Sequence, residues 1–399
     1  RVSGNTTGKE SAMPKSAAAG GTQASARLLV LVTGLFWLSQ YAFTPYINPE
    51  LERMGMNATF MGLVAGGYGL SQMLLRIPLG IWSDRLGLKK PFVVAGCVLV
   101  ALSAAGYLLS YTPGGFLISR TLGGAAAASW VSFTVLYSTY FPPEEGPGSI
   151  TRLNAVNLAG RLTGYGLMAL VLLFWELRAA FVVSFIAGFL ALALSLNIRE
   201  RPAESHDLSL KEILKTARNP YLLATSILGI LAMWTAFSSY YTFTVNVAWE
   251  LGARQQDLSL LQIALLAPNA LSNALVGRAG SRGKAFRQVT LGFVLIGLYC
   301  FLLPLVNSLA QLYALQVVGG VAATLTFAVL LGQCVRDIPP PQRSVGMGFF
   351  QATYGIGMTL GPIVMGVMID HLGFRIAFFA MAGFALIAAL LAYLLMKPR

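Results

Sequence analysis

Long apolar runs, separated by short polar segments, follow one another along the 399-residue chain. Each run has about 20 mostly apolar residues, which is enough for a helix to cross a hydrocarbon core of about 30 Å. We therefore predict an all-α membrane protein. The twelve predicted spans cover residues 27–48, 59–82, 91–111, 114–140, 150–174, 176–197, 219–248, 257–277, 287–305, 308–335, 343–369 and 373–396.

The second half of the chain repeats landmarks of the first half at an offset of about 197 residues. The paired landmarks are Gly80 and Gly277, Asp84 and Ser281, Arg85 and Arg282, Pro142 and Pro339, Pro143 and Pro340, Gly160 and Gly357, and Gly164 and Gly361. Gly123-Gly124 recurs as Gly319-Gly320 at an offset of 196. The repeat predicts two pseudo-symmetric six-helix bundles, residues 27–197 and 219–396. In a membrane protein with such repeats, a binding site lies between the halves, which rock around it.

Two segments lie outside the predicted bundles. Residues 1–26 are rich in Ser, Ala, Gly and Thr and lack the apolar core of a signal peptide, so we predict a disordered tail. Because residue 1 is Arg, we expect the numbering to begin inside a longer chain. Residues 198–218 form a charged linker, predicted to be cytoplasmic, in which residues 208–214 resemble a short amphipathic helix on the membrane surface.

The charge pattern supports the membrane assignment and gives a topology. Hydrophobic residues make up 56% of the chain and charged residues 11%, against about 25% charged in soluble domains. The net charge is +13, and 21 of the 28 Lys and Arg lie in the tails and in the loops after even-numbered spans. Basic loops stay in the cytoplasm, so both termini are predicted to be cytoplasmic in a multi-pass cell membrane protein. The charge is therefore a topology signal, and no nucleic-acid partner is expected.

Few residues suit catalysis or metal binding. The three cysteines lie inside predicted spans without metal-ligand spacing, and we interpret them as small packing residues. The two histidines are far apart, and neither a nucleophile elbow nor a phosphate-binding glycine loop is present in the sequence. We expect no enzymatic activity, no cofactor and no metal site.

The loop after the second span carries the most specific motif. Residues 80–90 read GIWSDRLGLKK and resemble the cytoplasmic loop signature of the major facilitator superfamily, G-x-x-x-D-R-x-G-x-[RK]-[RK]. Arg120-x-x-x-Gly124 resembles a second signature of that family, and residues 357–366 resemble its glycine–proline motif. The resemblance covers residues 27–396. It implies a twelve-helix secondary transporter that works by alternating access, with helices 1, 4, 7 and 10 around a central cavity.

The resemblance also implies a role for the loop motif, whose residues are Gly80, Asp84, Arg85, Gly87, Lys89 and Lys90. In similar transporters, the aspartate latches the halves shut on the inner side. Here Asp84 would meet the start of the eleventh helix near Arg343, where a carboxylate gains roughly 0.3–1 kcal/mol from unpaired amide groups. Ser281 replaces the acid in the second copy, which predicts a one-sided latch. The alternative is that the loop only fixes topology.

Three arginines lie within predicted spans, whereas no Asp or Glu lies deep in any span. Each such arginine costs about 2.5–3.5 kcal/mol on insertion scales. Arg161 is about 11 residues into its span, or roughly 17 Å, close to the membrane midplane. Our hypothesis is that Arg161, with Arg120 or Arg76, binds an anionic group of the substrate, because guanidinium suits carboxylate and phosphate.

Each arginine also has an interpretation without a substrate. Arg120 belongs to a motif found on carriers of varied substrates, so it would be structural or take part in proton handling. Arg76 would contact the inner loop or a neighbouring helix, and Arg161 has only amides nearby on its own helix. Further candidate binding residues are polar or aromatic and uncharged: Gln40, Tyr41, Trp234, Tyr240, Tyr241, Asn269 and Asn273. Packing is the competing interpretation for each of them.

The sequence therefore predicts a monomeric carrier of a small organic solute, with an anionic or amphiphilic substrate favoured. The absence of acids deep in the spans favours anion exchange or facilitated movement over carboxylate-mediated proton coupling. The alternatives are an exporter of apolar drug-like compounds, favoured by the 11% aromatic content, and a lipid or amphiphile flippase. Substrate identity, transport direction and coupling ion do not follow from the sequence.

Overall fold

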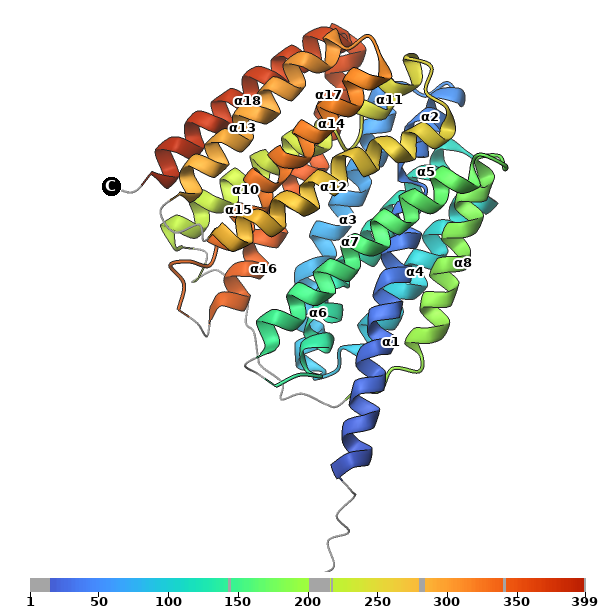
Figure 1. Cartoon of the computed structure of the whole chain (residues 1–399), viewed down its shortest axis with the longest axis vertical. Coiled ribbons are helices and arrows are strands. Elements are labelled where there is room, and N and C mark those ends of the chain that lie inside the picture. Colours follow the sequence, from blue (N-terminus) through green and yellow to red (C-terminus); the bar gives the residue numbers. More distant parts are fainter. Residues whose placement is uncertain are drawn as a thin grey trace, which may run out of the picture.

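The computed structural model describes residues 15–142, 145–200, 216, 218–279, 284–339 and 342–397. Regular structure in these residues is entirely helical (Figure 1). The first half contains α1 (Lys15–Tyr41), η1 (Thr44–Tyr46), α2 (Ile47–Arg53), α3 (Ala58–Arg85), α4 (Lys90–Leu109), α5 (Pro113–Ala128), α6 (Trp130–Ser138), α7 (Gly146–Val171) and α8 (Arg178–Ser195). The second half contains α10 (Pro220–Ser238), α11 (Thr244–Glu250), α12 (Gln255–Ala279), α13 (Ala285–Leu302), η3 (Leu303–Leu305), α14 (Leu309–Ala323), η4 (Thr324–Ala328), α15 (Val329–Gln333), α16 (Arg343–Thr353), α17 (Gly355–Leu372) and α18 (Phe374–Met396).

The all-helical membrane architecture predicted from the apolar runs is confirmed. Ten helical spans among the described residues are long and apolar enough to cross a membrane. The other two predicted spans are present as helices: α5 with α6 covers residues 113–138, interrupted at Ser129, and α7 covers residues 146–171. The break leaves α5 with 16 residues and α6 with 9, each too short to cross a membrane alone, while Arg152 and Arg161 lower the apolar character of α7.

The expectation of a disordered tail over residues 1–26 is wrong for its last part. Helix α1 begins at Lys15, so residues 15–26 are helical and extend the first span at its N-terminal end. The run of Ala residues there favours a helix, because Ala has the highest helix propensity. Residues 1–14, the predicted amphipathic segment 208–214 and the landmarks Pro143, Ser281, Arg282 and Pro340 lie outside the described residues.

Several predicted single spans are broken helices, and the breaks occur at equivalent places in the two halves. The first span is divided into α1, η1 and α2, and the seventh into α10 and α11. Each is followed by a turn through a glycine with positive φ, Gly55 at 77° and Gly252 at 79°. Glycine tolerates this left-handed conformation because it has no Cβ. The two glycines are 197 positions apart, so the repeat is visible in the backbone.

The halves pack closely along α3 and α17, where glycines lie in the contact. A Cβ atom added at Gly62 would lie 2.1 Å from the Pro362 carbonyl oxygen, and one at Gly66 would lie 2.6 Å from the Thr359 carbonyl oxygen. Within lipid, helices associate largely by such close packing, because lipid is as apolar as the side chains it would exclude. The α3–α17 contact therefore holds the two bundles together.

A set of hydrogen bonds joins the halves at one end of the bundle, where α2 and α11 lie away from the start of α1 (Figure 1). We call this end the opposite face, and the end with the start of α1 the terminal face. The Tyr46 hydroxyl is 2.5 Å from Ser259 Oγ, and Asn48 Nδ2 donates to the Thr242 carbonyl oxygen at 2.8 Å. Thr59 N donates to Asp370 Oδ2 at 2.8 Å. The halves are thus closed together at the opposite face.

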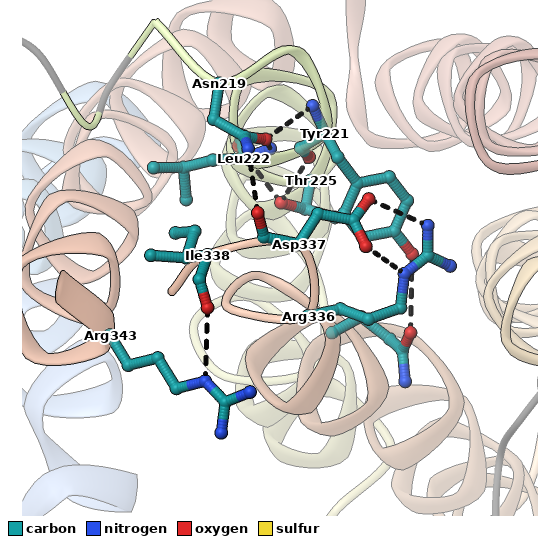
Figure 2. Close-up of polar contacts among 9 residues, drawn as sticks. Asn219, Tyr221, Leu222, Thr225, Arg336, Asp337, Ile338 and Arg343 are labelled. Atoms are coloured by element: carbon teal, nitrogen blue, oxygen red, sulfur yellow. Dashed lines mark hydrogen bonds and ion pairs between the residues drawn. The ribbon is translucent and has the colours of Figure 1, made fainter. Parts of the chain in front are cut away.

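The second half has its own polar cluster, which ties α10 to the segment between α15 and α16 (Figure 2). Asn219 caps α10 and donates through Nδ2 to the Asp337 carbonyl oxygen at 3.2 Å. Arg336 binds Asp337 with two contacts of 2.8 and 3.0 Å and lies 3.8 Å above the Tyr221 ring. The Arg336 side chain holds the pKa of the Asp337 carboxyl below its usual range. All of these contacts join residues of the second half, so the cluster stabilises that half alone.

Carboxylates from both halves approach each other at the opposite face. Glu52 of α2 accepts a hydrogen bond from Asn246 Nδ2 of α11 at 3.2 Å, and Arg53 lies 4.9 Å above the Trp249 ring. Burial, with the negative charge of Glu52, raises the pKa of Glu250 above its usual range. The closed arrangement therefore binds a proton at Glu250 more tightly than one in which the halves part here.

We expect the opposite face to open as pH rises. Protonated Glu250 favours the closed arrangement, so closure loses stability as pH rises from the ordinary glutamate range through the raised pKa. Spin labels on cysteines placed at Met56 and Arg254 would report the distance between halves, since the three native cysteines are buried. Glu250→Gln should abolish this opening between the ordinary glutamate range and the raised pKa, and Glu145→Gln should keep it. A pH-independent distance in the unaltered pair would contradict this prediction.

The α3–α17 contact also gives a stability prediction. Gly62→Ala should lower the thermal unfolding temperature, because its Cβ would collide with the Pro362 carbonyl oxygen. Gly383→Ala is the matched control: nothing lies within 4 Å of its added Cβ, and Ala is favoured over Gly in a helix by about 1 kcal/mol. Thermal unfolding of the purified variants measures both effects. Equal stability of the two variants would show that the contact is not tight.

Candidate functional site

Arg161 lies in the middle of α7, and its charge rests on an aromatic ring. Its guanidinium carbon is 4.1 Å from the centre of the Tyr41 ring at the end of α1. A cation over a ring face is attracted by the ring quadrupole, by up to about 2 kcal/mol when water is removed. Helices α1 and α7 approach closely enough for this contact because Gly160 has no side chain. A Cβ atom added there would lie only 2.5 Å from the Gly34 carbonyl oxygen. The side chain is therefore positioned by packing of two helices of the first half.

Tyrosines from both halves surround Arg161. The side chains of Tyr41, Tyr68, Tyr165 and Tyr241 all lie within electrostatic reach of its charge. Tyr165 packs edge-on against Tyr41 with 6.3 Å between ring centres. Tyr241 follows α10 in the second half and lies within electrostatic reach of the guanidinium. Arg161 thus lies at the seam between the halves.

Arg120 repeats the same arrangement on α5. Its guanidinium carbon is 4.2 Å from the centre of the Tyr68 ring, and Tyr68 is 3% exposed on α3. Tyr68 is also close to Tyr41 and within electrostatic reach of both Arg120 and Arg161. The structure therefore brings Arg161, Arg120 and Tyr41 into one cluster, which we call the arginine–tyrosine cluster: Tyr41, Tyr68, Arg120, Arg161, Tyr165 and Tyr241.

Arg76 is placed differently from the other two arginines. It is 5% exposed, and its Nη1 donates to the Tyr354 hydroxyl at 2.6 Å, at the junction of α16 and α17. Its Nε has no hydrogen-bond partner among the described residues. Arg76 therefore joins the halves through a neighbouring helix, which corresponds to the alternative interpretation drawn from the sequence.

The remaining predicted binding residues divide into two groups. Gln40 is 1% exposed and donates to the Gly123 carbonyl oxygen at 2.6 Å, while Asn269 donates to the Gly320 carbonyl oxygen at 3.3 Å. The Gln40 contact joins α1 to α5 within the first half, and the Asn269 contact joins α12 to α14 within the second half. Asn273 is exposed and donates to Asn269 Oδ1 at 3.5 Å. The aromatic candidates pack on other rings, Trp234 on Phe384, and Tyr240 on Tyr241 and Tyr299.

Two members of the cluster, Tyr68 and Tyr165, were missed by sequence reasoning. Tyr165 follows Arg161 by four residues, so the two share one face of α7, and this spacing is a signal that the sequence carried. Tyr68 had no comparable signal, because its approach to Arg120 depends on the packing of α3 against α5. A Cβ at Gly124 would lie 2.1 Å from the Tyr68 carbonyl oxygen, which shows how close that packing is.

The loop motif is anchored mainly within the first half. Asp84 pairs with Lys89 of its own loop, and Lys89 Nζ also donates to Ser83 Oγ at 3.1 Å. Lys90 N donates to Glu200 Oε2 at 2.9 Å, and Lys90 Nζ donates to the Leu196 carbonyl oxygen at 2.8 Å. The turn itself uses Gly87, whose φ of 61° favours glycine. Arg85 is exposed, and nothing lies within 4 Å of a Cβ added at Gly80.

Comparison with known proteins places the chain in a family. A family model described as Major Facilitator Superfamily matches residues 29–248 and 227–399. The riboflavin transporter RibZ of Clostridioides difficile is 28% identical over 115 residues, which are 29% of this chain and only 25% of that protein. Monocarboxylate transporter 10 of Homo sapiens is 22% identical over 80% of this chain and 66% of its own length. The multi-drug resistance efflux pump PmrA of Streptococcus pneumoniae is 20% identical, over 84% and 87%.

The fold is also shared with solved structures. A crystal structure of the nucleoside transporter NupG superposes with a TM-score of 0.79 at 14% sequence identity. The match covers 94% of this chain and all of that one. At this identity the likeness is one of fold, and it agrees with the two-bundle organisation read from the repeat.

The contact between Arg76 and Tyr354 gives a prediction about stability. Tyr354→Phe should destabilise the protein by about 1.5–3 kcal/mol, because the buried, charged guanidinium of Arg76 loses the hydroxyl that accepts its hydrogen bond. Tyr393→Phe is the control, since Tyr393 is exposed and its hydroxyl only accepts from Lys397 Nζ at 3.0 Å. Thermal unfolding of both variants is the measurement. If the two variants unfold at the same temperature, Arg76 does not depend on Tyr354.

Proposed function

Because the chain belongs to the major facilitator superfamily, whose members are membrane transporters rather than enzymes, we propose that it carries a small organic anion by alternating access. That it is a multi-pass membrane transporter of a small molecule follows from the family. The negative charge of the substrate and the residues that bind it are our inference from the arginine–tyrosine cluster.

The position of Arg161 is the observation that carries the proposal. Its guanidinium lies over the Tyr41 ring of the first half and within electrostatic reach of Tyr241 of the second half, at the seam that a rocking carrier would open alternately to each side. A group held there can contact the first half through Arg161 and the second half through Tyr241. Substrate binding and the relative position of the halves would then depend on each other.

The electrostatics of the site favour an anion. The ion pairs found in the described residues use Arg53, Lys89, Arg152 and Arg336, and none of them involves a membrane-depth arginine. The tyrosine faces offset part of the cost of desolvating a guanidinium, but they bring no negative charge. A carboxylate or phosphate of a substrate would supply that charge and accept two parallel hydrogen bonds.

Different relatives of the chain support different candidate substrates. Similarity to a protein named monocarboxylate transporter 10 supports an organic anion. Similarity to a protein named as a multi-drug efflux pump favours an exporter of drug-like compounds, and the rings of Tyr41, Tyr165 and Tyr241 would suit an apolar or amphiphilic body. A lipid or amphiphile flippase remains the third candidate. Loss of charge at Arg161 separates the anion carrier from the other two.

We further propose an orientation and a role for the loop motif. The basic loops favour an orientation in which the terminal face, with both chain termini, lies on the cytoplasmic side of the cell membrane. In this arrangement Asp84 is held by Lys89 while the opposite face is closed. When the terminal face closes instead, Asp84 would exchange this partner for the first turn of α16 and act as the latch. A single copy of the chain forms the whole pathway.

Transport by reconstituted protein tests the proposal. In proteoliposomes, Arg161→Gln should lower the affinity for an organic anion by about tenfold to hundredfold, as expected for the loss of a hydrogen bond between charged groups. Arg161→Lys should retain part of the affinity, because it keeps the charge but loses the planar pair of donors. Arg152→Gln is the matched control on the same helix, where Arg152 is exposed and pairs with Glu145 at 3.6 Å.

Two results would count against the proposal. Unchanged anion uptake by Arg161→Gln would show that this charge does not bind the substrate. Flux of neutral drug-like compounds that survives the substitution, with no anion carried by the unaltered protein, would favour the exporter.

A further inference from the structure

We propose that the substrate carries two negative charges and that Arg161 and Arg120 bind them together. The inference rests on the proposed function and narrows it from an organic anion to an organic dianion. Two carboxylates or one phosphate group would meet the requirement. The reasons are the shared geometry of the two arginines, their lack of negative partners and the neutral residues at the equivalent positions of the second half.

The two guanidinium groups have the same environment. Each has its guanidinium carbon over a tyrosine ring, 4.1 Å from the ring centre for Arg161 on Tyr41 and 4.2 Å for Arg120 on Tyr68. Those two tyrosines are close to each other, and Tyr68 is within electrostatic reach of both charges. Contact with a ring face leaves the in-plane N–H groups of a guanidinium free. The two sets of donors therefore belong to one site.

Neither charge is neutralised by the protein. In the part of the chain that the structure describes, no carboxylate pairs with Arg161 or Arg120, and Arg161 Nε is buried without a partner. Tyr241, the contribution of the second half, is neutral. A substrate with one negative charge would neutralise one guanidinium and leave the other, which is only partly exposed, without a negative partner. A dianion would neutralise both.

The repeat shows that the fold does not require these charges. The position equivalent to Arg161, at the offset of 197, is Met358 of α17, which is 5% exposed and packs in the core. The position equivalent to Arg120, at the offset of 196, is Gln316 of α14, which is fully buried. Gln316 accepts from the Tyr299 hydroxyl at 2.9 Å. Neutral residues therefore satisfy the same helix packing, so packing does not explain the charges of the first half.

Arg76 does not belong to this pair. Its guanidinium is committed to Tyr354 by a 2.6 Å hydrogen bond, and its ring contact is longer, at 5.9 Å. The equivalent position in the second half is Asn273, which is exposed. Two arginines, rather than three, are thus available to a ligand, and this number sets the expected charge of the substrate.

Binding of matched probes to the purified full chain tests the inference. Succinate, succinamate and succinamide share one carbon skeleton and carry two, one and no negative charges, and longer dicarboxylates with their amides extend the series. Glycerol 3-phosphate and glycerol form a second arm, which distinguishes a phosphate from a pair of carboxylates. We expect a dianion in one arm to bind at least about tenfold more tightly than its monoanionic or neutral partner in calorimetric titration, as one added contact between charged groups predicts.

The variants assign the two charges. Arg120→Gln should remove the preference for dianions and retain binding of the monoanion, whereas Arg161→Gln should weaken both. Arg120→Lys, which keeps the charge, should restore a preference for the dianion. Arg152→Gln, on the same helix as Arg161 and exposed, should leave the whole series unchanged. Size-exclusion profiles and thermal unfolding of each variant show whether it is folded.

The outcomes separate this inference from the proposed function. Equal affinity for monoanion and dianion, or an equal loss of both in Arg120→Gln, would overturn the two-charge site while leaving an organic anion as the substrate. Binding of neutral probes with no binding of any anion in either arm would overturn the proposed function as well. A dianion preference that vanishes only in Arg120→Gln and Arg161→Gln would support both.

Discussion

The placement of two guanidinium charges at membrane depth is the constraint on which the site depends. Such charges are costly within a bilayer, and here they face tyrosine rings rather than carboxylates. The rings must be held at about 4 Å from the charge, which requires helices α1 and α7, and α3 and α5, to approach closely. Gly160 and Gly124 permit that approach, since a side chain at either position would strike the backbone of the neighbouring helix. The glycines that allow close helix packing thus also bring the tyrosine rings into contact with the guanidinium groups.

The seam between the halves combines a close contact with polar ones. Along α3 and α17, glycines of each helix lie against the backbone and side chains of the other, so the two bundles meet at close range. At the opposite face, Tyr46 and Asn48 make side-chain hydrogen bonds that one rotation could break together. Tyr241 of the second half lies within electrostatic reach of Arg161 of the first half. A movement that parts the halves would therefore alter the environment of the bound charge.

Most of the fold followed from the sequence, whereas only part of the site did. Apolar runs give the helices because their length is a property of the bilayer, and the repeat gives the two bundles because duplicated sequences fold alike. Breaks such as that at Ser129 were missed, since hydropathy does not report backbone hydrogen bonds. Arg161 and Arg120 were found because a charge in an apolar run is conspicuous. Tyr68 was not, because a buried tyrosine looks like packing until the neighbouring helix is in place, and Gln40, which has the same polar signal, proved to join two helices.

The two halves have the same fold but differ in charge, and this difference makes the candidate site asymmetric. Arg161 and Arg120 belong to the first half, while the equivalent Met358 and Gln316 are neutral and committed to packing. A charged ligand would therefore stay attached to the first half while the second half moves past it with Tyr241. Asp84 follows the same rule, since its counterpart is Ser281. The repeat thus gives two halves of one fold, and the residues that depart from it, Arg161, Arg120 and Asp84, are those to which we assign substrate binding and the latch.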